Sequence, residues 1–83
     1  MTDEKINILQ KKIDELFREH NELLGKIMRL DVFLCSKKIN EIPDSQRNLL
    51  NVQFQIMRTY HQILRARIND ISDEIEKIKQ NRR

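Results

Sequence analysis

The chain of 83 residues has little of what shapes compact mixed folds: one cysteine, one proline, one glycine and no tryptophan. The single cysteine, Cys35, excludes an internal disulfide, so we expect a reducing compartment such as the cytoplasm. The sequence shows no leader and no run of about twenty apolar residues, so it predicts no membrane partner. Because glycine and proline are scarce and 35% of the residues are charged, the composition favours long exposed helices over a sheet.

What the chain does have is two heptad stripes, in which apolar residues recur at alternating steps of three and four. The first stripe consists of Ile6, Leu9, Ile13, Leu16, His20, Leu23, Ile27, Leu30 and Leu34. The second consists of Leu50, Phe54, Met57, His61, Leu64, Ile68, Ile71, Ile75 and Ile78. This spacing is typical of helices that pack knobs into holes. The stripes mirror each other, so one antiparallel register pairs every layer, from Ile6 with Ile75 to Leu30 with Leu50.

The stripes predict an all-α fold: a two-helix antiparallel coiled-coil hairpin that forms a single domain over residues 1–83. The expected elements are a helix over residues 3–36, a connection over residues 37–42 and a second helix over residues 43–80. Pro43 suits the first helical position, where its missing N–H costs nothing, and Asp44 suits the positive end of the helix dipole. A connection this short makes the two helices antiparallel neighbours.

The only two histidines, His20 and His61, fall opposite each other in this register. Two imidazoles are fewer ligands than the three or four of a stable zinc site, so we expect no metal and no cofactor. We favour a polar layer that fixes the register. Such a layer predicts acid sensitivity, because protonation would place like charges in the seam. Cys35 is interpreted as a small apolar packing residue rather than a nucleophile.

Both helices carry further apolar residues outside the paired stripes, crowded into the half of the hairpin near the turn. They are Leu49, Val52, Ile56, Tyr60 and Ile63 on the second helix, and Phe17, Leu24, Met28, Val32, Phe33 and Cys35 on the first. A helix that is apolar on two sides must bury both of them. We therefore expect the hairpins to assemble into a homo-oligomeric helical bundle, most simply with an even number of copies.

The net charge of +3 is a weak basic bias, which argues against binding to a nucleic acid polymer. Acidic and basic side chains are spaced as solvated helix faces and ion pairs. The sequence contains no glycine-rich phosphate loop, no nucleophile elbow and no isolated carboxylate pair. We therefore expect a protein that is not an enzyme and has no catalytic residues.

Both helices and the turn between them carry a distinctive set of motifs. The second helix carries Leu49-Leu50, Gln53, Met57, Tyr60, Ile63-Leu64 and Arg67-Ile68. The first helix ends in Lys26-Ile27, Leu30 and Phe33-Leu34, and the turn contains Ile42-Pro43 and Gln46. These motifs resemble those of a family of phage-encoded helical hairpins, the anti-defence "sponge" proteins that sequester cyclic oligonucleotide immune signals. The resemblance covers residues 5–70. It implies a phage protein in the cytoplasm of the bacterial host that forms a multimer, such as a hexamer, and holds cyclic dinucleotides or trinucleotides without cleaving them.

The same resemblance points to a ligand-binding site that needs planes for bases and donors for phosphates. On the second helix, Gln53 would supply an amide for a base edge, Tyr60 a stacking ring and Arg67 a phosphate or base contact. The complementary wall would come from Lys26, Arg29 and Phe33 of the first helix. Alternatives remain open for two of these residues: Tyr60 as an aromatic of the oligomer core, and Arg67 as the ion-pair partner of Asp70 or Glu74.

A second functional hypothesis is a protein-protein interaction module. In this reading, the apolar surface near the turn would bind a host defence protein and inhibit it, as a helix binds in a groove. Substitutions such as Ile56→Asp would then abolish protein capture, while nucleotides would have no effect. A hairpin that binds nucleic acid polymers would instead show affinity that falls steeply with salt.

Overall fold

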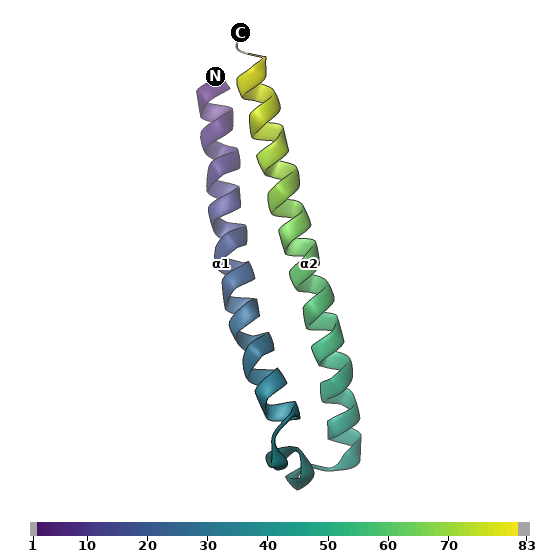
Figure 1. The fold of residues 1–83 in the computed structure, drawn as a ribbon. Helices are drawn as coiled ribbons and strands as arrows, with labels where there is room; N and C mark the ends of the chain where they lie inside the picture. The colour runs from purple at the N-terminus through teal and green to yellow at the C-terminus, as the bar shows by residue number, and fades with distance from the viewer. Residues whose placement is uncertain (1, 82–83) are drawn as a thin grey trace.

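The computed structural model describes residues 2–81 and consists of two long helices joined by a short helical connection (Figure 1). Helix α1 spans Thr2–Leu34, the 3-10 helix η1 spans Lys37–Glu41, and helix α2 spans Asp44–Gln80. The long helices run antiparallel, so the start of α1 and the end of α2 lie together at the end opposite η1 (Figure 1). The Cα atoms span 61 × 15 × 15 Å. The expectation of an all-α helical hairpin is confirmed.

Local hydrogen bonds set the boundaries of the connection. Helix α1 ends at Leu34, two residues before the predicted end, and the Ser36 hydroxyl donates a hydrogen bond of 2.7 Å to the Phe33 carbonyl. Ser36 itself is extended (ψ 164°), because serine offers the backbone a local alternative to the helix. Pro43 precedes the helix (ψ 150°), and its carbonyl accepts from the Arg47 N–H at 3.0 Å. The expectation that Pro43 is the first helical residue is therefore wrong by one position.

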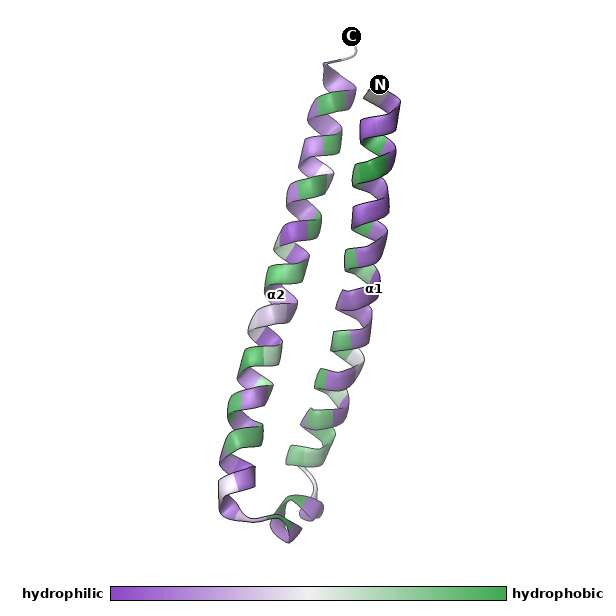
Figure 2. Cartoon of the chain, turned by 180° about the vertical axis from the view of Figure 1, so that it is seen from behind, coloured by the Kyte–Doolittle hydropathy of each residue, from purple (hydrophilic) through white to green (hydrophobic). Residues whose placement is uncertain are grey.

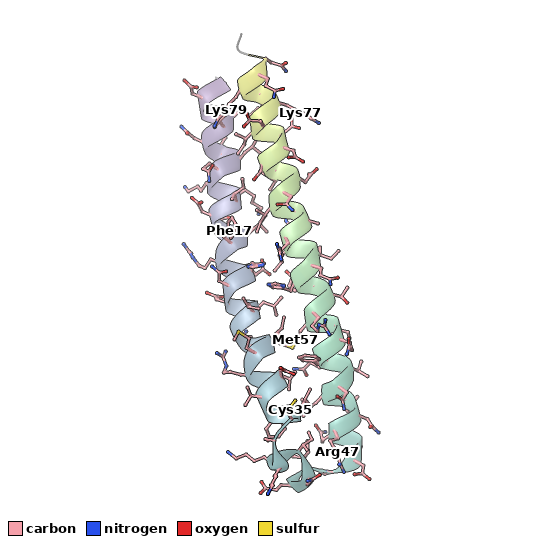
Figure 3. The ribbon with its side chains drawn as sticks, in the orientation of Figure 1. Phe17, Cys35, Arg47, Met57, Lys77 and Lys79 are labelled. Atoms are coloured by element: carbon pink, nitrogen blue, oxygen red, sulfur yellow. The ribbon has the colours of Figure 1, made fainter. Side chains whose placement is uncertain are left out.

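The seam between α1 and α2 is built from the two heptad stripes. Its buried cluster consists of Ile13, Leu16, Leu64, Ile68 and Ile75, with Ile6, Leu9, Leu23 and Ile71 packed against it. Every one of these residues belongs to a stripe, and Leu64 is completely buried. Figure 3 shows side chains from both helices filling the space between the ribbons, with Met57 among them in the half near the turn. The apolar seam along the whole hairpin follows the predicted stripes.

Outside the seam, a second set of large apolar side chains is exposed. It comprises Ile8, Phe17, Leu24, Met28, Val32, Leu49, Val52, Ile56, Tyr60 and Ile63. Figure 2 shows apolar segments along both helices, including the halves near the turn. Neither helix within residues 2–81 combines the length and apolarity that crossing a membrane requires. Cys35 is also exposed, and its thiol contacts the Asp31 carboxylate at 3.9 Å, so its interpretation as a packing residue is wrong for the hairpin.

The two histidines meet in the seam as the register predicts. Their rings are stacked, with centroids 3.9 Å apart and planes inclined by 28°. His20 Nδ1 lies 3.1 Å from Asn21 Oδ1, and the amide oxygen accepts a hydrogen bond in the tautomer that carries the proton on Nδ1. The Nε2 atoms of His20 and His61 are buried without a hydrogen-bond partner among the described residues. Burial, the facing His20 and the nearby Arg65 all lower the pKa of His61 below 6.5.

The lowered pKa of His61 predicts loss of stability in mild acid. The unfolded chain binds a proton on this imidazole near pH 6.5, whereas the folded chain resists it, so stability is full above pH 6.5 and falls as the pH drops through the folded pKa. We expect the melting temperature to fall by a few degrees between pH 8 and pH 5. The change should be markedly smaller in a His20→Leu/His61→Leu variant, and an equal change in both proteins would contradict a role for the stack.

Candidate functional site

Most of the predicted ligand-binding residues lie along one flank of the hairpin. The Tyr60 hydroxyl of α2 donates a hydrogen bond across the seam to the Glu19 carboxylate of α1. Residues seven apart lie on the same side of a coiled-coil helix, so the rows that contain Glu19 and Tyr60 face each other along this flank. We call it the tyrosine flank: Glu19, Lys26 and Phe33 from α1, and Gln53, Tyr60 and Arg67 from α2.

The centre of the tyrosine flank is the hydrogen-bonded pair of Tyr60 and Glu19. The pKa of Tyr60 is raised above 10.0, first because its hydroxyl donates to Glu19, then by burial and by the negative charge of Glu19, while the positive charge of Arg67 opposes the shift. Arg67 makes no ion pair among residues 2–81. Tyr60 keeps 41% of its surface exposed, so the hairpin leaves an aromatic surface and a cation available one helical repeat apart.

The other predicted site residues differ in their exposure and contacts. Lys26 is exposed and Phe33 is half-buried, while the Gln53 amide donates weakly to Met57 Sδ at 3.8 Å. The guanidinium of Arg29 folds back over Gly25, with one nitrogen 3.3 Å from where a Cβ at Gly25 would stand. Arg29 is therefore drawn towards the outer face of α1, because Gly25 leaves room there. The structure does not bring Arg29 to the tyrosine flank.

The opposite flank carries a groove that the sequence reasoning did not identify. Two adjoining hollows of about 200 and 260 Å³ lie there, and Arg65 lines both of them. We call the pair the arginine groove; its lining consists of Phe17, His20, Leu24, Ile27, Arg58, His61, Gln62, Arg65, Ile68 and Asn69. The histidine stack contributes to both hollows. The lining contains two arginines, two histidines and no carboxylate.

Helical geometry explains why the two surfaces lie on opposite flanks. Residues two apart on an α-helix point about 200° apart, so Arg58 lies across the seam from Tyr60, and Phe17 lies across it from Glu19. Arg58 and Arg65 are seven apart and face Phe17 and Leu24, which are also seven apart. The sequence could therefore have indicated the arginine groove, because the heptad register places these four residues on one flank.

No group of three or more histidine, cysteine or acidic side chains within residues 2–81 could hold a metal ion. The surfaces instead combine exposed aromatic rings, guanidinium groups and open hollows, which suit reversible binding of an anion with planar parts. Fold and surfaces together define a small helical-hairpin binding protein.

Comparison with known proteins identifies the family. The model of the Sequestin family matches residues 10–70, which is well over half of the chain. The chain therefore belongs to the Sequestin family of phage anti-defence proteins, which sequester cyclic nucleotide signals. Searches of curated proteins and of solved structures find no significant match. The resemblance inferred from the hairpin motifs is confirmed, and the matched segment contains both flanks.

The Tyr60–Glu19 pair makes a spectroscopic prediction, since Tyr60 is the only tyrosine and the chain has no tryptophan. Replacement of Glu19 by glutamine removes the negative charge that disfavours the phenolate, so the pKa of Tyr60 should fall towards 10. Absorbance at the phenolate band during a pH titration measures it directly. Glu22→Gln is the matched control on the same helix. Equal pKa values in the Glu19→Gln variant and the wild type would show that the pair does not form.

Proposed function

We propose that this protein sequesters a cyclic dinucleotide or trinucleotide in the cytoplasm of a bacterial host and does so without cleaving it. Membership of the Sequestin family supports the sequestering role. The single structural observation that carries the proposal is Tyr60, a partly exposed aromatic ring with the unpaired guanidinium of Arg67 one repeat along the same flank.

The chemistry of the tyrosine flank suits such a ligand. Stacking on an aromatic ring is insensitive to sequence because every base has a π-face, and Arg67 can donate two parallel hydrogen bonds to a phosphate. The Gln53 amide can turn from its weak contact with Met57 to a base edge. Lys26 and Phe33, on the facing row, supply a further cation and a second ring. In this proposal, Glu19 holds the Tyr60 hydroxyl and so orients its ring.

The ligand-binding proposal predicts that the wild-type protein releases heat on titration with at least one member of a panel of cyclic dinucleotides and trinucleotides. The ligand should be recovered intact after heat release. Loss of one stacking ring costs on the order of 1–3 kcal/mol, so Tyr60→Ala should weaken binding by roughly tenfold or more. Isothermal titration calorimetry gives the affinity, and chromatography of the released ligand tests for cleavage.

Arg67→Gln should also weaken binding, whereas Arg18→Gln, which removes the same charge from exposed α1 surface, should not. A panel that produces no heat, or a ligand recovered as linear products, would overturn the proposed function. Equal losses in Arg67→Gln and Arg18→Gln would mean that only net charge attracts the ligand and would remove the tyrosine flank from the proposal.

We also propose that the hairpin acts as a homo-oligomer that assembles through an apolar ridge on α2. The ridge consists of Leu49, Val52, Ile56 and Ile63, whose exposed fractions lie between 51% and 62%. Such a continuous apolar surface is expected to be covered in a stable protein. Ile56, Tyr60 and Ile63 share one shallow hollow, so a copy packed on the ridge would come close to the Tyr60 ring. Assembly and ligand binding would then use neighbouring surfaces.

The ridge predicts that Ile56→Asp converts the oligomer to single hairpins, because assembly would bury an unpaired charge. Native mass spectrometry measures the number of copies, and circular dichroism confirms that the hairpin stays helical. The matched control is Ile8→Asp, since Ile8 is equally exposed, at 63%, but lies in the half of α1 far from the turn. A monomeric wild type, or capture of a host protein that Ile56→Asp abolishes and nucleotides do not affect, would instead favour a protein-protein interaction module.

A further inference from the structure

The arginine groove holds two guanidinium groups whose charge is not neutralised within the hairpin. Neither Arg58 nor Arg65 takes part in an ion pair among the described residues. The Arg58 guanidinium lies 5.7 Å from the centroid of the Phe54 ring, which holds it by a cation–π contact and leaves its donors for another partner. Arginine side chains that line a hollow and have no acidic partner can bind an anion there.

The histidine stack forms the floor of the groove beside Arg65. His20 and His61 line it, and the Arg65 charge is close enough to lower the pKa of His61. An anion in the groove would relieve that repulsion.

The dimensions and walls of the groove indicate the kind of anion. Arg58 and Arg65 are seven residues apart, which is about 10 Å along the helix, so one small ion cannot reach both. Phe17 forms the end of the groove, is 48% exposed and makes an edge contact with His20 at a centroid distance of 6.2 Å. Its remaining face is free for a planar ring. Two separated cations beside an exposed aromatic ring match a ligand with two phosphates and a base.

We propose that the arginine groove is a nucleotide-binding surface distinct from the tyrosine flank, in which Arg58 and Arg65 contact phosphodiester oxygens and Phe17 contacts a base. The identity of the ligand rests on the proposed function, whereas the anion site rests on the groove itself. One hairpin thus offers two binding surfaces, separated by the thickness of the seam.

The test uses inorganic pyrophosphate and cyclic di-AMP as probes and reads the arginine Nε–H resonances and the ring resonances of histidine, phenylalanine and tyrosine by nuclear magnetic resonance. Pyrophosphate should shift Arg58, Arg65 and His61 in a saturable manner and leave Arg18 and Arg29 unmoved. An Arg58→Gln/Arg65→Gln variant should bind pyrophosphate at least about tenfold more weakly, the loss expected for charge-assisted hydrogen bonds. Arg58→Lys/Arg65→Lys, which keeps the charge but loses the paired donors, should fall between that variant and the wild type.

Cyclic di-AMP separates the two surfaces. Shifts at Arg58, Arg65 and Phe17 that persist in Tyr60→Ala would support a distinct groove site. Shifts spread equally over all arginines with pyrophosphate, or cyclic di-AMP shifts confined to Tyr60 and Arg67, would overturn the inference and leave sequestration at the tyrosine flank intact. Conversely, a saturable pyrophosphate site at the groove beside a silent panel of cyclic nucleotides would overturn the proposed function while the anion site stands.

Discussion

The antiparallel register of the seam is the constraint on which every other feature depends. A coiled coil can in principle slide by one heptad and still pair apolar rows. Here such a slide would place His20 against Phe54 or Ile68, and it would likewise place His61 against an apolar residue of the first stripe. Each imidazole would then face an apolar side chain, with no second imidazole to stack on. The stack at 3.9 Å therefore acts as a register lock, at the cost of two unpartnered Nε2 atoms.

Once the register is fixed, the two flanks are fixed with it. The short segment from Arg58 to Tyr60 supplies one residue to each flank, because positions two apart point to opposite sides of the helix. All residues of both flanks lie on α1 or α2 and none lies on a loop, so a regular helix positions each side chain. The same geometry keeps the Glu19 carboxylate on the tyrosine flank and leaves the arginine groove without an acid. The difference in charge between the flanks is thus a consequence of the heptad register alone.

The seam and the histidine pair could be predicted because they depend only on periodicity. The end of α1 could not, because a single hydroxyl at Ser36 competes with the helix for a backbone carbonyl. The position of the Arg29 guanidinium over Gly25 could not be predicted either, because that space is visible only in three dimensions. The arginine groove was missed for another reason: the family motifs include Arg67 but neither Arg58 nor Arg65, which the register places together on the opposite flank. Residues that are close in the sequence can lie on opposite sides of a helix.

Neither surface of a lone hairpin can enclose a ligand. Tight sites for small molecules bury roughly 70–90% of the ligand surface, whereas the hollows here are open and lie on a rod only 15 Å across. Sequestration demands slow release, which follows from burial and not from charge, because charge mainly speeds association. A second copy is the simplest source of the missing wall. The apolar ridge runs beside Tyr60, so the surface through which we propose that copies assemble is also the one that can close over a bound ring. On this reasoning, assembly of two copies would bury both the exposed apolar ridge and the ligand.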